Sequence, residues 1–231
     1  MPARKALLTG ISLLTALGLA PVRAEVLSLS SASGMALLTS SEHRRDFAPL
    51  VNRFITQATL SYCGVASAVM VLNSLNVPSP PAAGYRSYRF WTQDNLFDRS
   101  LPLSLTRQQV VRRGMTLAQL AQLLNSRGVD VTTFHATELS LDRFRSNLVA
   151  GLNRPDQRVL VNYLRPVIGQ QGGGHISPIA AWHAATDQVL LLDVARYRYP
   201  AGWIPVKTLW EASRTVDSAS GKSRGLVIVQ R

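Results

Sequence analysis

The stretch Gln57-Ala-Thr-Leu-Ser-Tyr-Cys63-Gly-Val-Ala-Ser-Ala-Val-Met70 contains the single cysteine of the 231-residue chain. A polar approach changes at Cys63 into an apolar run whose large residues recur at helical spacing, which predicts a helix from Gly64 to Leu75. Cys63 would then lie at the helix N-terminus, where unpaired N–H groups and the helix dipole stabilise a thiolate. A thiol that merely packs in the core is the alternative interpretation.

A cysteine nucleophile needs a base, and the chain offers four histidines. His175 follows three glycines and opens a β-branched run that starts at Ile176, so backbone or substrate can approach it closely. His43 lies in a charged segment and is expected to be solvated. His135 is expected to be structural, and His183 could lie in the core or at the surface. The alternative for His175 is a structural histidine at a strand edge.

Asp193 is the candidate that would orient the imidazole. It stands in the apolar stretch 189–195, where a buried carboxylate needs a partner. Simple hairpin pairing across the turn at Thr186–Gln188 does not align it with His175, so a bulge or bend near Ser177-Pro178 would be required. Gln57, six residues before Cys63, could donate to an oxyanion beside the Cys63 N–H.

Helical patterns precede strand patterns along the chain. Thr116 and Gln119 form a capping box before a leucine-rich helix that Gly128 stops, and Ser140 caps a helix through Leu152. The predicted strands are Arg158–Leu164, Ile176–Ala185, Val189–Ala195 and Leu226–Val229. This order predicts an α+β fold with an antiparallel sheet rather than a parallel βαβ sheet.

The N-terminus predicts a secretory signal peptide over residues 1–24. Arg4 and Lys5 are followed by the apolar stretch Ala6–Ala20, and Val22-Arg23-Ala24 offers a cleavage point before Glu25. Because that stretch is shorter than the ~20 residues of a spanning helix, an uncleaved anchor is the second interpretation. We therefore expect an exported, periplasmic catalytic domain over residues 25–231 without stable membrane association.

The charge balance is basic, with a formal net charge of +12. Removal of the three basic residues of the predicted signal lowers it to +9. The basic residues form no long run, so solubility and attraction of small anionic substrates are favoured over nucleic-acid binding. A lone thiol in an oxidising compartment is a chemical liability, which favours a functional Cys63.

Several segments together resemble the phytochelatin synthase family of papain-like cysteine transpeptidases. They occur in order from about Phe47 to Arg231 and are more specific together than alone. The matching segments are Thr56-Gln57-x5-Cys63-Gly64, Gly174-His175-Ile-Ser-Pro-Ile-Ala-Ala-Trp-His-Ala, Leu192-Asp193-Val-Ala-Arg-Tyr-Arg-Tyr-Pro, Trp203-Ile-Pro-Val, Leu209-Trp-Glu-Ala and Asp217-x6-Arg224-Gly225.

The resemblance implies a papain-like fold, with a helical part that carries the nucleophile and a sheet that carries His175 and Asp193. It implies that Gln57 belongs to the oxyanion hole of this triad. It further implies substrate binding by Gly174, Asp217 and Arg224, the last two at the ammonium and carboxylate of a γ-glutamyl group. Without the family, Asp217 and Arg224 read as an ordinary surface pair in a polar turn.

One departure from the family concerns length. Plant and yeast members have a cysteine-rich C-terminal extension, whereas this chain stops shortly after Arg224. The resemblance is therefore to the short bacterial form, which cleaves glutathione to release glycine, with weak or absent transfer to a second glutathione. We expect glutathione and related thiol peptides as partners and leave a homodimer open.

We expect no bound cofactor and no protein-held metal, because clusters of cysteine and histidine ligands are missing. Cadmium or zinc would enter as a thiolate complex of the substrate. Two rival functions remain at this level. One is a cysteine hydrolase acting on another small peptide or isopeptide, and the other is a non-enzymatic protein whose thiol scavenges or senses metal.

Overall fold

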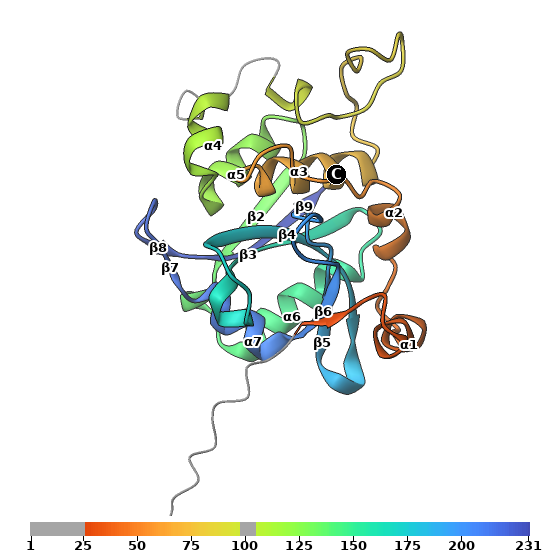
Figure 1. The fold of residues 1–231 in the computed structure, drawn as a ribbon, viewed down its shortest axis with the longest axis vertical. Helices are drawn as coiled ribbons and strands as arrows, with labels where there is room; N and C mark the ends of the chain where they lie inside the picture. The colour runs from red at the N-terminus through yellow and green to blue at the C-terminus, as the bar shows by residue number, and fades with distance from the viewer. Residues whose placement is uncertain (1–25, 98–104) are drawn as a thin grey trace, which may run out of the picture.

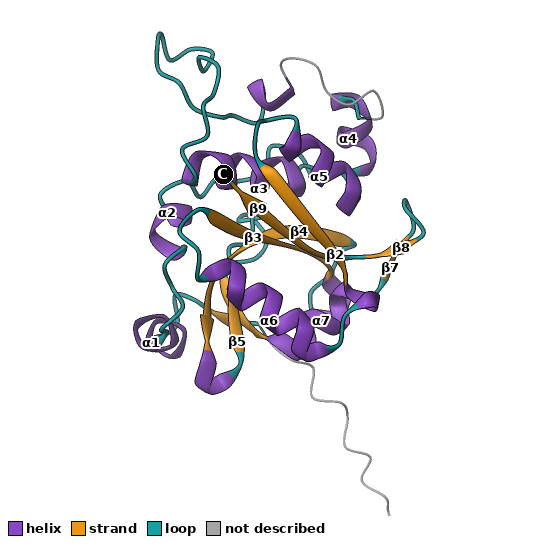
Figure 2. Cartoon of the chain, turned by 180° about the vertical axis from the view of Figure 1, so that it is seen from behind, coloured by secondary structure: helices purple, strands orange, loops and turns teal. Residues whose placement is uncertain are grey.

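The computed structural model describes residues 26–97 and 105–231, so the predicted signal peptide, residues 1–24, lies outside the described residues. Helices cover both faces of a central antiparallel sheet (Figures 1 and 2). The α+β class predicted from the sequence is therefore confirmed.

The described part of the chain contains α-helices, β-strands and short 3-10 turns. The α-helices are α1 (Ala32–Ser40), α2 (Phe47–Val51), α3 (Cys63–Ser74), α4 (Arg107–Arg113), α5 (Leu117–Asn125), α6 (Leu141–Leu152) and α7 (Val206–Ser213). The strands are β1 (Leu27–Ser28), β2 (Asp130–His135), β3 (Gln157–Leu164), β4 (Gly174–His183), β5 (Gln188–Leu191), β6 (Gly202–Pro205), β7 (Val216–Asp217), β8 (Lys222–Ser223) and β9 (Gly225–Gln230). Short 3-10 turns include η3 (Arg165–Ile168), directly after β3, and η4 (Ala184–Thr186), between β4 and β5.

Seven strands form the main sheet in the order β1-β6-β5-β4-β3-β9-β2. The pairings are antiparallel, and β7 and β8 form a separate small hairpin. Strand β4, which carries His175, lies in the middle of the sheet between β3 and β5. Its first half pairs with β3 up to Ile179, and its second half, from Ile179 to His183, pairs with β5.

The two faces of the sheet bury separate apolar clusters. Leu160 of β3 packs in the cluster that includes α3 and α5, whereas Val159 and Val161 pack in the cluster that includes α6 and α7. This alternation follows the two-residue period of a strand. Figure 1 shows α3 and α5 on one side of the sheet and α6 and α7 on the other.

Helix α3 is buried on nearly every side, because it lies between the sheet and an outer layer of loops and helices. All of its residues except Asn73 are buried, so it is a core helix and not the one-faced amphipathic helix that the spacing suggested. A Cβ at Gly64 would lie 2.5 Å from Met115 Cε and 3.2 Å from Ile176 Cδ1. The small residue at this position therefore lets the start of α3 approach β4 closely.

The structure corrects the predicted hairpin around Asp193. Strand β5 ends at Leu191, so the second half of the predicted strand Val189–Ala195 is wrong. The register of β4 and β5 shifts between Ile179 and Ala181, a short way beyond the bend expected near Ser177-Pro178. The Leu192 N–H donates to the Pro178 carbonyl, and the chain then leaves the β4–β5 ladder. This departure brings Asp193 beside His175.

The helix predictions hold better than the strand boundaries. The predicted capping box at Thr116 and the predicted N-cap at Ser140 are both present. The predicted strand Ile176–Ala185 instead runs from Gly174 to His183, because the 3-10 turn η4 begins at Ala184. Helices α1 and α7 and strand β6 were not predicted, because their short segments have mixed composition.

A buried ion pair ties the start of β3 to the N-terminal helices. Arg158 Nη1 lies 3.1 Å from Asp46 Oδ1, and its Nε donates to Ser74 Oγ at 3.1 Å. Both charged side chains are almost fully buried. Burial raises the pKa of Asp46 to about 7, against the opposing positive charges of Arg158 and Arg45.

We predict that Arg158→Met lowers the free energy of unfolding by about 3 kcal/mol at neutral pH, because it leaves Asp46 buried without its counter-charge. Asp46 in the folded variant would bind a proton more readily than in the unfolded chain. The raised pKa of Asp46 makes stability fall as pH rises from about 4 to about 7 in the wild type, and in the variant this fall should be larger and extend to higher pH. Urea unfolding across this range measures both effects.

Arg154→Met is the matched control, because Arg154 pairs with Asp156 at the surface, 3.2 Å away. Its unfolding midpoint should stay at the wild-type value. Equal midpoints for the Arg158→Met protein and the wild type would show that the buried pair does not support the fold.

Candidate active site

Cys63 is the first residue of α3. The residue before it, Tyr62, supplies no side-chain cap, so the first-turn N–H groups stay available to an anion. Cys63 is 8% exposed, and the Ser67 hydroxyl donates to the Ile176 carbonyl at 3.1 Å one turn later. This bond fixes the beginning of α3 against the strand that carries His175.

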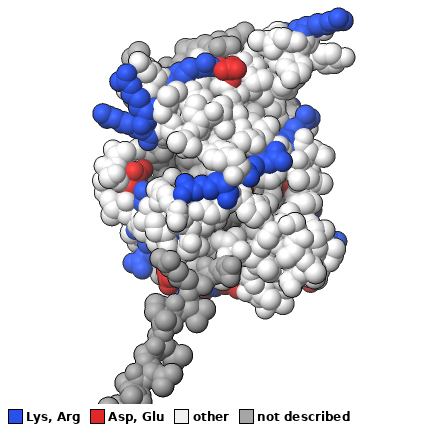
Figure 3. All heavy atoms as spheres, in the orientation of Figure 1, with Lys and Arg blue, Asp and Glu red and all other residues white. Residues whose placement is uncertain are grey.

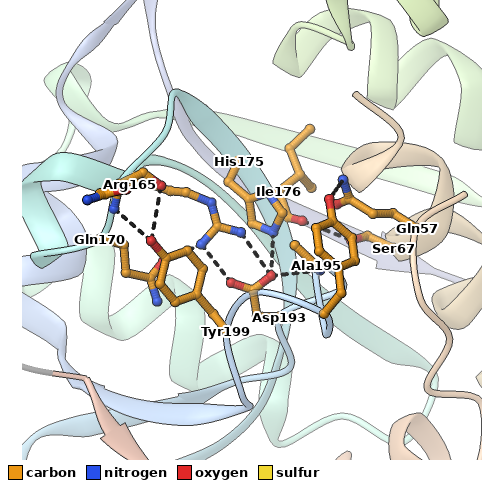
Figure 4. Close-up of polar contacts among 11 residues, drawn as sticks. Gln57, Ser67, Arg165, Gln170, His175, Ile176, Asp193, Ala195 and Tyr199 are labelled. Atoms are coloured by element: carbon orange, nitrogen blue, oxygen red, sulfur yellow. Dashed lines mark hydrogen bonds and ion pairs between the residues drawn. The ribbon is translucent and has the colours of Figure 1, made fainter. Parts of the chain in front are cut away.

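His175 is the second residue of β4, opposite Tyr163 of β3. Its ring meets the Tyr163 ring edge-on, with centroids 5.7 Å apart, and the residue is 4% exposed. His175 Nε2 lies 2.8 Å from Asp193 Oδ1 (Figure 4). The two atoms are an ion-pair distance apart, although the ring N–H does not meet the angular requirement for a hydrogen bond.

The pKa values of the three groups shift in the directions that stabilise a thiolate beside an imidazolium. Burial acts to raise the pKa of Cys63, but the positive charge of His175 and hydrogen bonds with His175, Ile176 and Gly64 bring it below its ordinary value. Burial acts to lower the pKa of His175, but the charges of Cys63 and Asp193 and contacts with them raise it above its ordinary value. These directions favour the thiolate–imidazolium form of the pair, in which the sulfur is the stronger nucleophile.

Arg165, which the sequence analysis missed, holds the other side of Asp193. Its Nη1 donates to Asp193 Oδ2 at 2.8 Å and its Nη2 to Asp193 Oδ1 at 3.0 Å. Burial acts to raise the pKa of Asp193, but His175 and Arg165 together hold it well below its ordinary range. The sequence does contain a signal for this contact. Arg165 is an isolated cation in the apolar stretch 159–168, and Asp193 is an isolated anion in the apolar stretch 189–195.

A cavity of about 670 Å³ opens over Cys63 and His175. Its walls come from the loop before α3, the end of α4, strands β3 and β4, and the β7–β8 hairpin. They consist of Thr59, Leu60, Ser61, Cys63, Val111, Arg112, Arg113, Gly114, Met115, Asn162, Gly173, Gly174, His175, Ile176, Asp217, Ser218, Ala219 and Arg224.

The cavity brings Gly174, Asp217 and Arg224 together with Cys63 and His175. Arg224 is 7% exposed, and its Nη1 donates to the Val216 carbonyl at 2.7 Å. Its buried Nε has no hydrogen-bond partner among the described residues. A Cβ at Gly174 would lie 3.0 Å from the Arg224 guanidinium, so glycine leaves the space that this side chain fills.

Asp217 stands in the same wall without contacting Arg224 directly. Its Oδ1 accepts the Ala219 N–H at 3.0 Å, and it is half-buried. Burial lowers the pKa of Arg224, partly opposed by the charge of Asp217. The surface-pair interpretation of these two residues is therefore wrong, because Arg224 is buried in the cavity wall and makes no ion pair with Asp217.

Gln57 lies near this site but is engaged elsewhere. Its Nε2 donates to the Thr59 carbonyl at 2.8 Å and to the Tyr197 hydroxyl at 3.2 Å, while its buried Oε1 has no partner among residues 26–97 and 105–231. Both amide hydrogens are therefore taken in this conformation. The oxyanion role of Gln57 stays a prediction, and it requires that Nε2 turn away from one of its present acceptors.

The other three histidines lie in structural contacts. His43 stacks against Trp182 with centroids 4.9 Å apart, so it is not simply solvated. His135 Nδ1 bonds to the Ser223 carbonyl at 2.6 Å, and His183 Nδ1 contacts the Thr186 hydroxyl. Of the four, His175 is the histidine that the structure places at the thiol.

Neither a metal-ligand cluster nor a membrane-spanning helix occurs in the part of the chain that the structure describes. There, no group of three or more histidine, cysteine, aspartate or glutamate side chains is placed to hold a metal ion. Within the same ranges, none of the helices has the length and apolar character that crossing a bilayer requires. On the face drawn in Figure 3, the basic side chains lie in several separate places.

Comparison with known proteins decides the family. The family model described as phytochelatin synthase matches residues 19–226. The chain belongs to the phytochelatin synthase family. The resemblance drawn from the sequence is thereby confirmed.

Curated phytochelatin synthase relatives cover most of this chain. Glutathione gamma-glutamylcysteinyltransferase 1 of Lotus japonicus is 37% identical over 185 residues, which are 80% of this chain and 36% of the relative. Glutathione gamma-glutamylcysteinyltransferase 1 of Arabidopsis thaliana is 31% identical over 208 residues, 89% of this chain and 42% of the relative. Glutathione gamma-glutamylcysteinyltransferase of Schizosaccharomyces pombe is 31% identical over 181 residues, 78% of this chain and 42% of the relative. This chain thus spans about two fifths of the length of these relatives.

We predict that His175→Asn slows alkylation of Cys63 by iodoacetamide about tenfold or more near pH 6. The substitution removes the positive charge that does most to lower the thiol pKa against the effect of burial. The rates of variant and wild type should converge well above the ordinary thiol pKa. Mass spectrometry reports the reaction without ambiguity, since Cys63 is the single cysteine.

His183→Asn is the control, because this residue lies at the far end of the same strand. Its alkylation profile should match that of the wild type. An unchanged profile for the His175→Asn protein would mean that the imidazole does not stabilise the thiolate.

Proposed function

We propose that this phytochelatin synthase family member is a cysteine transpeptidase and hydrolase that cleaves the Cys–Gly amide of glutathione. The relatives named as glutathione gamma-glutamylcysteinyltransferases support the enzyme class. The observation that carries the proposal is the cavity that joins the Cys63–His175–Asp193 cluster to Arg224 and Asp217. It combines a nucleophile with groups that fit a zwitterionic γ-glutamyl end.

In the first half-reaction, the Cys63 thiolate attacks the carbonyl carbon of the Cys–Gly amide. The tetrahedral oxyanion forms at the N-terminus of α3, where a well-placed N–H donor contributes about 3 kcal/mol. Protonated His175 gives its proton to the glycine nitrogen, and the C–N bond breaks. The products are free glycine and a γ-glutamylcysteinyl thioester on Cys63.

In the second half-reaction, neutral His175 takes a proton from the acceptor as it attacks the thioester. Water as acceptor releases γ-glutamylcysteine, and the amine of a second glutathione gives a longer thiol peptide. We propose hydrolysis as the main outcome and transfer as the weaker one. Glutathione carried as a cadmium or zinc thiolate would be a substrate form, and no protein-held cofactor takes part.

The charges of the cavity wall favour an acidic thiol peptide as the substrate. The cavity wall has three arginines, Arg112, Arg113 and Arg224, against one carboxylate, Asp217. Glutathione offers two carboxylates and one ammonium, so the wall matches both signs. A guanidinium suits the γ-glutamyl carboxylate, and Asp217 suits its ammonium.

The architecture supports a papain-like arrangement, with the nucleophile at a helix N-terminus and its histidine and aspartate on an antiparallel sheet. We propose that the protein acts after export, as the N-terminal sequence pattern indicates, and that it needs no stable membrane association or nucleic acid. A cysteine hydrolase for another small peptide is the alternative on the same triad. It would share Cys63 but would not depend on Arg224.

Mixing the protein with glutathione should give a γ-glutamylcysteinyl adduct on Cys63, detected by mass spectrometry after acid quenching. Cys63→Ala should show neither the adduct nor release of glycine, while its circular dichroism stays at the wild-type signal. Glycine release by the Cys63→Ala protein would eliminate the thioester mechanism.

Arg224→Gln should raise the KM for glutathione about ten- to hundredfold, because it removes a charge-assisted hydrogen bond to the γ-glutamyl carboxylate. With γ-aminobutyryl-cysteinyl-glycine, which lacks that carboxylate, variant and wild type should have the same KM. Arg214→Gln, outside the cavity wall, is the control. Equal KM values of Arg224→Gln and wild type for glutathione would favour the alternative hydrolase.

A further inference from the structure

We propose that Arg165 is a positioning residue of this site, which acts through Asp193 to keep His175 aimed at the Cys63 thiolate. The inference rests on the proposed cysteine chemistry and adds a fourth member to the triad. Arg165 begins η3, directly after β3, and it is 4% exposed. Its guanidinium is therefore turned into the protein and not toward an incoming substrate.

The geometry of the Asp193 carboxylate favours this role. Oδ2 accepts from Arg165 Nη1, and Oδ1 accepts from Arg165 Nη2 and from the Ala195 N–H at 2.8 Å. These bonds fix the plane of the carboxylate and leave Oδ1 beside His175 Nε2 (Figure 4). A lysine cannot reproduce the two-pronged contact, because it has no planar fork of donors.

Arg165 also joins the loop that leads into β4, just before His175, to the loop that follows β5 and contains Asp193. Its Nη1 contacts the Gln170 amide oxygen, and its backbone N–H donates to the Gly173 carbonyl at 3.2 Å, just before His175. Its guanidinium carbon lies 4.7 Å from the centre of the Tyr199 ring, in the loop after Asp193. The Tyr199 hydroxyl in turn accepts the Gln171 N–H at 2.8 Å.

Glycine at position 172 makes this packing feasible. Gly172 has φ +121°, and a Cβ there would lie 3.2 Å from Arg165 Cδ. A side chain at this position would thus combine backbone strain with a contact against Arg165. Two of the three glycines before His175 therefore make room for an arginine, Gly172 for Arg165 and Gly174 for Arg224.

Removal of Arg165 should weaken the thiolate. The charged and titratable groups near Asp193 are His175, Arg165, Cys63 and Tyr163. Loss of the arginine subtracts a positive charge from this set and frees the carboxylate to rotate away from His175. Both effects make the anionic sulfur less favourable, so the thiol should ionise at higher pH.

The test measures alkylation of Cys63 by iodoacetamide from about pH 5 to about pH 10, a reaction that does not involve glutathione. Arg165→Met should move the midpoint of the rate profile upward by about one pH unit, which is about tenfold in rate at a fixed low pH. Arg165→Lys should fall between Arg165→Met and the wild type. A wild-type midpoint for the Arg165→Met protein would overturn the proposal.

Two further variants separate positioning from general damage to the fold. In an Asp193→Asn background, Arg165→Met should change the rate by less than about threefold, because its positioning effect is gone and only the direct effect of its charge remains. Arg158→Met, which breaks the other buried arginine–aspartate pair, should lower stability without moving the alkylation midpoint. An equal midpoint shift in the Arg158→Met protein would assign the effect to lost stability and overturn the proposal.

Steady-state assays with glutathione distinguish a failure of the Arg165 inference from a failure of the proposed function. If Arg165 acts through His175, Arg165→Met should lower kcat strongly and leave KM within about threefold. A selective rise in KM would instead make Arg165 a substrate-binding residue. A shifted alkylation midpoint together with no glutathione cleavage by the wild type would sustain the role of Arg165 and reject glutathione as substrate.

Discussion

The contact between the start of α3 and strand β4 is the constraint on which the site depends. Gly64 lets the helix approach the strand, and Ser67 bonds to the Ile176 carbonyl. This contact joins residues more than a hundred positions apart in the sequence and places the Cys63 sulfur beside His175. Because α3 is buried on nearly every side and β4 is a central strand, neither partner can shift without disturbing the core.

Charge balance explains how four ionised groups can be buried together. Thiolate Cys63, imidazolium His175, carboxylate Asp193 and guanidinium Arg165 alternate in sign, and their formal charges sum to zero. An isolated buried charge would be costly, whereas an alternating row compensates each member. The same row explains why the pKa of Cys63 is lowered despite burial: each neighbouring charge is held in place by the next.

Local patterns predicted the parts of the structure that local physics determines. The helix at Cys63, the caps at Thr116 and Ser140 and the candidates His175 and Asp193 all follow from spacing and residue type. The bulge that aligns Asp193 with His175 does not, because a register shift depends on which strands pair on both sides. The role of Arg165 was missed for a related reason: the sequence shows an isolated cation in an apolar stretch, but only the fold shows that it pairs with Asp193.

The groups proposed to react and the groups proposed to recognise the substrate lie in different parts of the cavity wall. The reacting groups come from α3, β4 and the segment after β5, all anchored in the core. Arg224 and Asp217 come from the β7–β8 hairpin, which is separate from the main sheet, and from its junction with β9. Changes in the hairpin can therefore alter which peptide binds without moving the sulfur or its base. In the proposed reaction, the first half-reaction uses the anchored groups whatever the acceptor. The balance between water and a second peptide would then depend on the rest of the wall. That part includes the exposed Leu60 and the end of α4, where a bound acceptor would exclude water from the thioester.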